Sequence, residues 1–317
     1  AGLPIACAAL TVDTQCCAGL DAVAMAIGLL ASGQAEVVIA GGVETWSRSP
    51  IRMHRPLNAN DAPIAYERPA FAPNPEQDPD MLMSAARYAA HVGFTRAQQE
   101  AYALASHQKA VAHHDLIAAE IVTVAGVSQD AYPRLMGADR AQRMPIVART
   151  DQPPPHNADA FALSSLTISA QADGAAFVLL ITPEAATRLG VHAKAKCVAT
   201  ASVGSDPASP LLAAELAARE AFRRAGANNA HEMQFVELHD AFAVQGLSFA
   251  KGLSLDTARL NVHGGGIARG HPIGASAAIA LVRVLADLDR SASSGAQGLV
   301  AVAGAGGLGA AAVLAKL

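Results

Sequence analysis

Three residues of this sequence carry side chains that together could transfer an acyl group: Cys16, His239 and His271. A cysteine attacks as its thiolate, and a neighbouring histidine can remove the thiol proton and later return it. A second histidine could help to bind the oxygen of a thioester as negative charge develops on it. The set therefore favours nucleophilic acyl-transfer chemistry with Cys16 as the nucleophile.

Each of these side chains is expected at a helix start or in a tight turn. Cys16 lies in the stretch VDTQCCAGL, where the free amides and the dipole of the following helix favour a thiolate. His239 follows a predicted strand in the stretch LHDAF, and His271 lies in the turn GGGIARGHP. The glycines of that turn let the backbone approach a ligand, and Pro272 stiffens the next peptide. The alternative for each histidine is a buried imidazole with no catalytic role.

The remaining cysteines indicate the cellular compartment of the protein and no further functional site. Four cysteines in 317 residues are too few for a disulfide scaffold, and Cys7 and Cys197 are expected to be inert buried side chains. This usage indicates a reducing environment and a cytoplasmic protein. His113 and His114 lack metal-ligand spacing relative to Cys16 and Cys17, so no metal site is predicted.

Composition excludes several other classes of function. Hydrophobic residues make up 52% of the chain and charged residues 16%, which is enough apolar material for one large or two medium cores. A net charge of -4 gives no sign of a nucleic-acid or membrane-surface partner. The sequence shows neither a signal-peptide pattern nor a charge-free apolar run long enough to span a bilayer. The stretch GAGGLG fits a dinucleotide-binding pattern, but too few residues follow for the required helix and acidic residue.

The hydrophobic pattern predicts an α/β fold in two halves with an insertion in the first half. A polar, proline-rich stretch over residues 47–156 is too long for a plain loop and indicates an inserted domain. Asp240 is expected to cap a helix that starts at Ala241. Helices are predicted at residues 18–30, 95–114, 211–225 and 274–288, and strands at residues 36–40, 173–181, 195–203, 235–238, 299–303 and 310–316.

Taken together, these segments resemble the thiolase superfamily of acyl-CoA condensing enzymes along essentially the whole chain. Residues 12–20 resemble the segment of the nucleophilic cysteine, and residues 41–47 (GGVETWS) resemble the signature that follows it. Residues 95–111 are similar to a helix of the CoA-binding loop domain, and residues 173–180 to the return strand. The most specific match is NVHGGGIARGHPIG at residues 261–274, which resembles the GHP motif. The His-Asp-x-Phe motif is closest to the sterol-carrier-type branch and to thiolase-like proteins.

This resemblance implies a fold of two βαβαβαββ halves in α-β-α-β-α layers, with an inserted loop domain. Residues 1–46 and 157–190 would form the N-terminal half, residues 47–156 the loop domain, and residues 191–317 the C-terminal half. Because the family begins with a segment whose first strand is central, we expect the natural start of the protein to precede Ala1.

The resemblance also assigns roles residue by residue. Cys16 would accept the acyl group, His271 would activate it and help to form its oxyanion hole, and His239 would orient a water in a second oxyanion hole. The substrate- or CoA-binding positions would be Ser169, Phe242, Gly270, Gly306 and Gly307. The resemblance implies coenzyme A thioesters as substrates without a permanently bound cofactor, a homodimer or homotetramer, and the option of a small auxiliary subunit.

Two departures from the family pattern concern proton transfer. Ala303 occupies the position of the second thiolase cysteine, and Ala241 that of the cysteine in the sterol-carrier-type motif. A third departure is that only Ser169 matches clearly in the stretch SLTIS. We therefore expect an acyl-CoA C-acyltransferase of the acetyl-CoA acetyltransferase or 3-ketoacyl-CoA thiolase type, working through acyl-Cys16. The alternatives are a decarboxylating, ketosynthase-like condensing enzyme with a Cys-His-His set, or a thiolase-like subunit of an acyltransferase complex.

Overall fold

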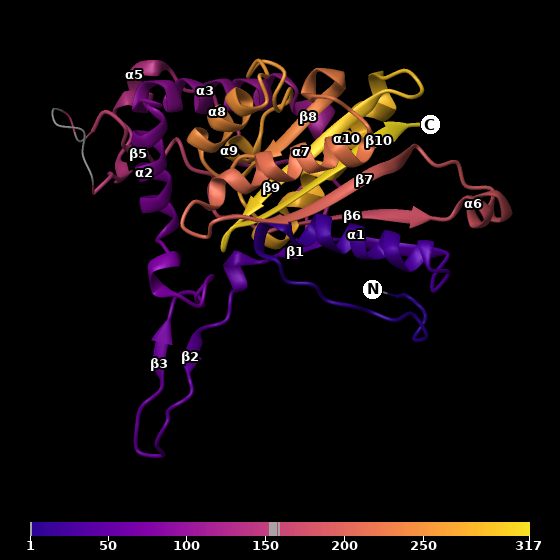
Figure 1. The fold of residues 1–317 in the computed structure, drawn as a ribbon, viewed down its shortest axis with the longest axis horizontal. Coiled ribbons are helices and arrows are strands. Elements are labelled where there is room, and N and C mark those ends of the chain that lie inside the picture. Colours follow the sequence, from indigo (N-terminus) through magenta and orange to yellow (C-terminus); the bar gives the residue numbers. More distant parts are fainter. Residues whose placement is uncertain (1, 152–156, 158) are drawn as a thin grey trace.

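Two β-sheets with helices packed between and outside them form the body of the molecule (Figure 1). The computed structural model describes residues 2–151, 157 and 159–317. The larger sheet has the strand order β7–β10–β9–β8, with β8 parallel to β9 and the other pairs antiparallel. The smaller sheet pairs β1 with β6 in antiparallel fashion. The strands are β1 Val37–Glu44, β6 Gly174–Ile181, β7 Ala195–Gly204, β8 Met233–His239, β9 Gln297–Gly304 and β10 Leu308–Lys316.

The side chains of β9 point alternately to the two faces of the larger sheet and show which helices cover each face. Leu299 and Ala301 pack into the cluster that contains α7 (Ala213–Ala225) and α8 (Ala243–Gly252). Val300 and Val302 point the other way, toward α1 (Ala18–Ala31) and α10 (Ser276–Ser291). Since successive side chains of a strand face opposite sides of its sheet, the described residues form α-β-α-β layers with α1 and α10 between the sheets.

The outer face of the smaller sheet is apolar and open. Five alternate side chains of β1 and β6 are exposed on it: Val37, Ile39, Val43, Phe177 and Leu179. Within the described part of the chain, no element covers this face. A row of exposed apolar side chains of this kind marks a surface that another element or chain can cover.

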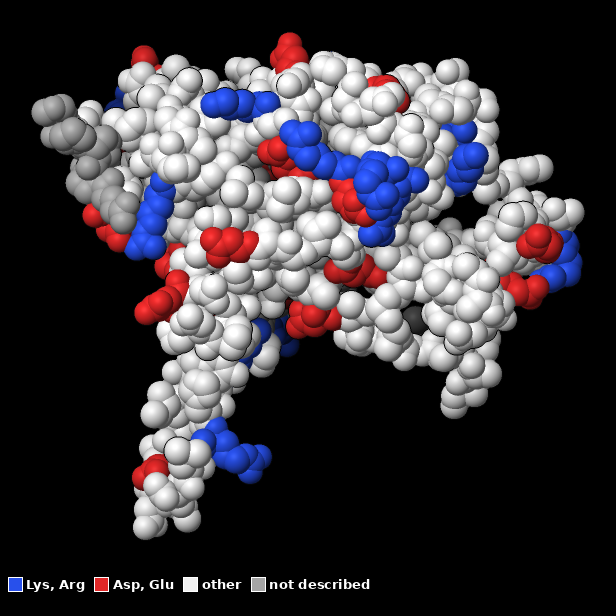
Figure 2. All heavy atoms as spheres, viewed as in Figure 1, with Lys and Arg blue, Asp and Glu red and all other residues white. Residues whose placement is uncertain are grey.

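The segment between β1 and β6 contains short helices and a projecting arm. The helices are α2 Met81–Val92, α3 Arg96–Ala112, α4 His114–Ala118 and α5 Ala138–Gln142, with the short pair β4 Ile146–Ala148 and β5 Leu163–Ser164. Helix α3 begins with a capping box between Thr95 and Gln98, which satisfies its first free amides. The arm is the hairpin of β2 (Arg52–His54) and β3 (Ile64–Tyr66), which extends away from the body (Figures 1 and 2) and exposes Ile51, Met53, Leu57 and Ile64.

Most predicted elements are confirmed, with shifts of a few residues at their ends, but the predicted cap at Asp240 is wrong. Helix α8 begins at Ala243 after Phe242. Asp240 instead accepts hydrogen bonds from the Tyr102 hydroxyl at 2.7 Å and the Ile267 amide at 3.3 Å. These buried donors take up the carboxylate oxygens that capping would need.

The predicted domain boundary at residue 156 lies outside the described residues. Of the helices that the structure describes, none is both long and apolar enough to cross a membrane.

Candidate active site

Cys16 and His271 are in direct contact although 255 residues separate them. The Cys16 Sγ lies 3.2 Å from the His271 Nε2. Cys16 belongs to a 3-10 turn, Gln15–Cys17, that leads into α1. Gln15 has a φ of 56°, in the left-handed region that costs a non-glycine residue about 1 kcal/mol. This strained turn is the local feature that presents the thiol to the loop of His271.

The hydrogen bonds around His271 fix which of its nitrogens faces the thiol. Its Nδ1 lies 2.8 Å from the Ser276 Oγ, and the Ser276 hydroxyl donates its single proton to the Pro272 carbonyl at 2.7 Å. The serine oxygen must therefore accept from Nδ1–H of His271. The neutral imidazole consequently turns the lone pair of Nε2 toward Cys16, as a general base requires. Sequence reasoning missed Ser276, whose signal is a serine at the first residue of α10, five positions after the histidine.

The signature at residues 41–47 holds the backbone of this loop. The indole Nε1–H of Trp46 donates to the His271 carbonyl at 3.2 Å, and the Gly274 amide donates to the Glu44 carboxylate at 3.2 Å. On the other side, the His271 amide donates to the Ala170 carbonyl at 2.6 Å. The loop is thus anchored from the N-terminal half on two sides, which keeps the imidazole in place against the thiol.

His239 joins the pair by stacking rather than by a hydrogen bond. It ends β8, and its ring lies 4.3 Å from that of His271 between centroids, at an interplanar angle of 28°. His239 is 3% exposed, and its Nε2 has no hydrogen-bond partner among the described residues. The structure therefore brings together all three residues that the sequence analysis selected. The buried His239 Nε2 is therefore a polar atom at the centre of the site that is free to bond a ligand or a water molecule.

A cavity of about 400 Å³ opens beside the thiol and the imidazole. Ser169 and Phe242, which the resemblance assigns to substrate binding, both line it, and the Ser169 hydroxyl donates to the Gly266 carbonyl at 2.6 Å. Cys16 and His271 supply the titratable groups of its described lining, whereas His239 lies outside that lining. Most of the remaining lining is apolar: Phe71, Met81, Leu82, Ile168, Pro210, Leu211, Phe242 and Ile273. Such a lining suits an acyl chain and excludes water.

The predicted glycine positions are next to this cavity rather than in its lining. Gly270 precedes His271 with a φ of 99°, which an L-residue rarely adopts, so the turn into the histidine depends on glycine. Gly306 and Gly307 form the turn between β9 and β10, and their neighbours Gly304 and Ala305 line the cavity.

Burial controls the charge of the two reacting groups. It raises the pKa of the Cys16 thiol to about 12, while the amides of Ala305 and Cys16 act in the opposite direction. Burial also lowers the pKa of His271 to about 4. Loss of hydration therefore opposes the thiolate that the sequence predicts at this helix start, and it outweighs the favourable amides. Both shifts favour a neutral thiol beside a neutral imidazole.

The two alanines that the resemblance aligns with family cysteines line the same cavity. Ala241 and Ala303 present methyl groups to it, which cannot transfer a proton. Cys17 is buried and its Sγ lies 4.0 Å from the Val302 carbonyl, away from the cavity lining. Cys197 is half-buried, while Cys7 is exposed, contrary to the prediction of a buried side chain. In the described lining, Cys16 supplies the thiol.

Comparison with known proteins now places this geometry in a family. The family model described as "Thiolase, N-terminal domain" matches residues 1–184, and the one described as "Thiolase, C-terminal domain" matches residues 191–316. The chain belongs to the thiolase family. The division of this thiolase into two halves and a loop domain over residues 47–156 stays a prediction.

Individual proteins agree with this assignment. The thiolase is 32% identical to an acetyl-CoA acetyltransferase of Pseudomonas aeruginosa, across 100% of this chain and 81% of that protein. It is 32% identical to a β-ketoadipyl-CoA thiolase of Acinetobacter baylyi, across 92% of this chain and 76% of that protein. The Acat5 thiolase structure from Ascaris suum, in complex with coenzyme A, superposes with a TM-score of 0.85 at 25% identity and covers 99% of this chain and 81% of its own. The predicted thiolase fold is confirmed.

The role of Ser276 can be tested by Ser276→Ala. Without the acceptor for Nδ1–H, the His271 ring loses its fixed tautomer, and the rate of Cys16 acylation should fall about tenfold to a hundredfold. Single-turnover kinetics with an acyl-CoA would measure this rate. Ser291→Ala is the matched control, because the Ser291 hydroxyl also donates to the carbonyl of the residue four positions earlier but lies at the far end of α10. Equal rates for Ser276→Ala and the unaltered protein would contradict the assignment.

The neutral Cys16–His271 pair predicts a particular pH dependence of alkylation. Because the pKa of Cys16 is raised to about 12, the thiolate fraction should rise about tenfold per pH unit between pH 6 and 9, and labelling by iodoacetamide with it. Peptide mass spectrometry in a Cys7→Ala/Cys17→Ala background would report Cys16 alone on its peptide. A labelling rate that stays level across this range would instead show a thiolate–imidazolium pair.

Proposed function

We propose that this chain acts on acyl-CoA thioesters through a covalent acyl-Cys16 intermediate. The chain is an acyltransferase of the thiolase type. The observation that carries the proposal is the 3.2 Å contact between the Cys16 Sγ and the His271 Nε2 at the wall of an apolar cavity. The relatives named acetyl-CoA acetyltransferase and the coenzyme A complex of the Ascaris thiolase support acyl-CoA as the substrate, with no cofactor bound permanently.

The first half-reaction follows from the geometry. The Cys16 sulfur attacks the thioester carbonyl as its proton passes to Nε2 of His271, which forms a tetrahedral intermediate. The amides of Cys16 and Ala305 act on the sulfur, and we expect the same amides to stabilise the oxygen that becomes negative. Collapse of the intermediate releases the coenzyme A sulfur, which takes the proton from His271. An acyl-Cys16 and free coenzyme A remain.

The second half-reaction depends on what accepts the acyl group. Carbon–carbon bond formation needs a carbanion, and the cavity presents methyl groups at Ala241 and Ala303 instead of a second thiol. His271, with His239 stacked on it, is the basic group left beside the acyl-cysteine. This favours an acceptor whose carbanion forms by loss of CO2, as in a decarboxylating condensing enzyme, over direct removal of an α-proton. The thiolase-like subunit of a larger complex is the remaining alternative.

The acyl intermediate can be trapped on Cys16. Incubation with acetyl-CoA or acetoacetyl-CoA, followed by peptide mass spectrometry, should give an acyl adduct on Cys16, and Cys16→Ala should abolish it. Cys17→Ala is the matched control, because Cys17 is adjacent but outside the cavity lining, and it should keep the adduct. An adduct that persists on another residue in Cys16→Ala would refute the proposal.

The acylated protein can then be used to compare malonyl-CoA with acetyl-CoA as the acceptor of the acyl group. If decarboxylation supplies the carbanion, acyl-Cys16 should condense with malonyl-CoA at least about tenfold faster than with acetyl-CoA, since no second base of the thiolase kind assists the latter. Formation of acetoacetyl-CoA from acetyl-CoA alone at a comparable rate would reject the decarboxylating alternative.

We also propose that the chain works in the cytoplasm as a homodimer or homotetramer. The four free cysteines support a reducing compartment. The exposed apolar side chains of the arm and of the outer face of β1 and β6 support assembly. Light scattering should give a whole multiple of the 32.3 kDa chain mass, and Leu57→Asp on the arm should shift the assembly toward smaller species. A single-chain mass at micromolar concentration would exclude self-assembly, and a mass between multiples would favour an auxiliary subunit.

A further inference from the structure

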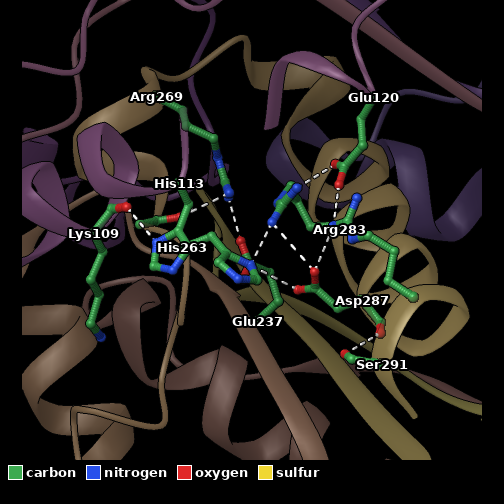
Figure 3. Close-up of polar contacts among 11 residues, drawn as sticks. Lys109, His113, Glu120, Glu237, His263, Arg269, Arg283, Asp287 and Ser291 are labelled. Atoms are coloured by element: carbon green, nitrogen blue, oxygen red, sulfur yellow. Dashed lines mark hydrogen bonds and ion pairs between the residues drawn. The ribbon is translucent and has the colours of Figure 1, made fainter. Parts of the chain in front are cut away.

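A buried ion pair joins the two segments that carry the histidines. The Arg269 Nη2 lies 2.5 Å from the Glu237 Oε1, and the two side chains are 7% and 5% exposed. Glu237 is the second residue before His239 on β8, and Arg269 is the second residue before His271. One charge-assisted contact therefore links the two histidine segments at matching positions. Figure 3 shows Arg269 reaching Glu237.

Helix α9 (Gly266–Arg269) connects this ion pair to the stacked rings. At its first residue, a Cβ on Gly266 would lie 2.7 Å from the Cε1 of His239, so the backbone of α9 packs directly on that ring. At its last residue, Arg269 pairs with Glu237 and also donates to the Gly264 carbonyl at 2.9 Å. The next residues, Gly270 and His271, then turn into the cavity. A short rigid segment thus touches one histidine and leads into the other.

The pair also sets the charge around His239. The pKa of His239 lies well below its usual range because the ring is buried, and the neighbouring His271 and Arg269 lower it further. Asp130 and Asp240 add negative charge near Arg269, and Tyr102 donates to Asp240 at 2.7 Å. Glu237 neutralises the guanidinium directly, so neither charge is left unpaired in the interior. Removal of one partner would leave the other uncompensated.

We propose that the Arg269–Glu237 ion pair is a positioning element for the chemistry at Cys16, because it fixes β8 and the His271 loop at the spacing that stacks the two imidazoles. The inference rests on the proposed acyl transfer at Cys16. Neither residue lines the cavity, so the pair acts through the histidines and not on the substrate. Substrate affinity should therefore be insensitive to it, whereas the reacting geometry should depend on it.

The test compares Arg269→Met and Glu237→Gln with Arg269→Lys. Both disruptive variants should lower kcat about tenfold to a hundredfold and leave KM for the acyl-CoA within about twofold, because a misplacement of the order of 1 Å costs that much in rate. Arg269→Lys keeps the positive charge and should recover much of the loss. The double variant Arg269→Met/Glu237→Met removes both charges, so it should regain stability relative to the single variants while kcat stays low.

Arg283→Met is the matched control for the loss of a buried charge. Arg283 is 3% exposed and ion-paired with Glu120 and Asp287 on the neighbouring network of Figure 3. It should lose comparable stability in chemical denaturation without the fall in kcat. An unchanged kcat in Arg269→Met, or an equal fall in Arg283→Met, would overturn the proposal.

A second readout keeps this test separate from the acyl-CoA reaction. Iodoacetamide labels Cys16 whatever its natural acyl donor, and its rate at a fixed pH reports how the fold presents the thiol beside His271. Labelling should slow in Arg269→Met and Glu237→Gln and be retained in Arg269→Lys and Arg283→Met. If no acyl adduct forms on the unaltered protein but this labelling pattern holds, the proposed function fails and the positioning role stands. If the adduct forms but labelling is the same in all variants, the positioning role fails.

Discussion

The contact between Cys16 and His271 is the constraint on which the rest of the architecture depends. Two neutral groups become a reactive pair only if the lone pair of one faces the proton of the other, and they belong to segments at opposite ends of the chain. The layered core satisfies this condition by packing α1, which follows Cys16, against α10, which follows His271. A Cβ at Gly19 would lie 2.7 Å from the Ala278 amide nitrogen. The two helices can therefore pack this closely only because residue 19 has no side chain.

The remaining contacts around Cys16 and His271 each hold a different part of the site. Ser276 determines the tautomer of His271, and Trp46 holds the loop backbone. The Arg269–Glu237 pair acts at a greater distance, between the loop and β8. Polar groups that are buried and fully paired stabilise one arrangement, since any alternative leaves a donor or a charge without a partner. The site is therefore specified by a shell of hydrogen bonds in an apolar interior.

Much of this could be predicted from the sequence, and the exceptions have physical reasons. The strands and helices follow from hydrophobic periodicity, and the three residues of the candidate site follow from their positions at strand ends and glycine-rich turns. The proton state of Cys16 could not be predicted, because it depends on how much water the fold removes, and burial here outweighs the helix start. Asp240 precedes an apolar helix and looks like a cap, but Tyr102 from a distant helix takes its carboxylate. Ser276 was missed because a serine at a helix start has many uses, and only the folded loop shows which carbonyl takes its proton.

The apolar lining of the cavity has a consequence for the lifetime of the proposed acyl-enzyme. Once coenzyme A has left with the proton, the described walls present one neutral imidazole and otherwise few groups that could activate a water molecule. Hydrolysis of the thioester is then slow because water is both scarce and weakly nucleophilic there. The acyl group can therefore stay on Cys16 until the second substrate binds. The apolar cavity wall thus allows coenzyme A to leave before the acceptor enters.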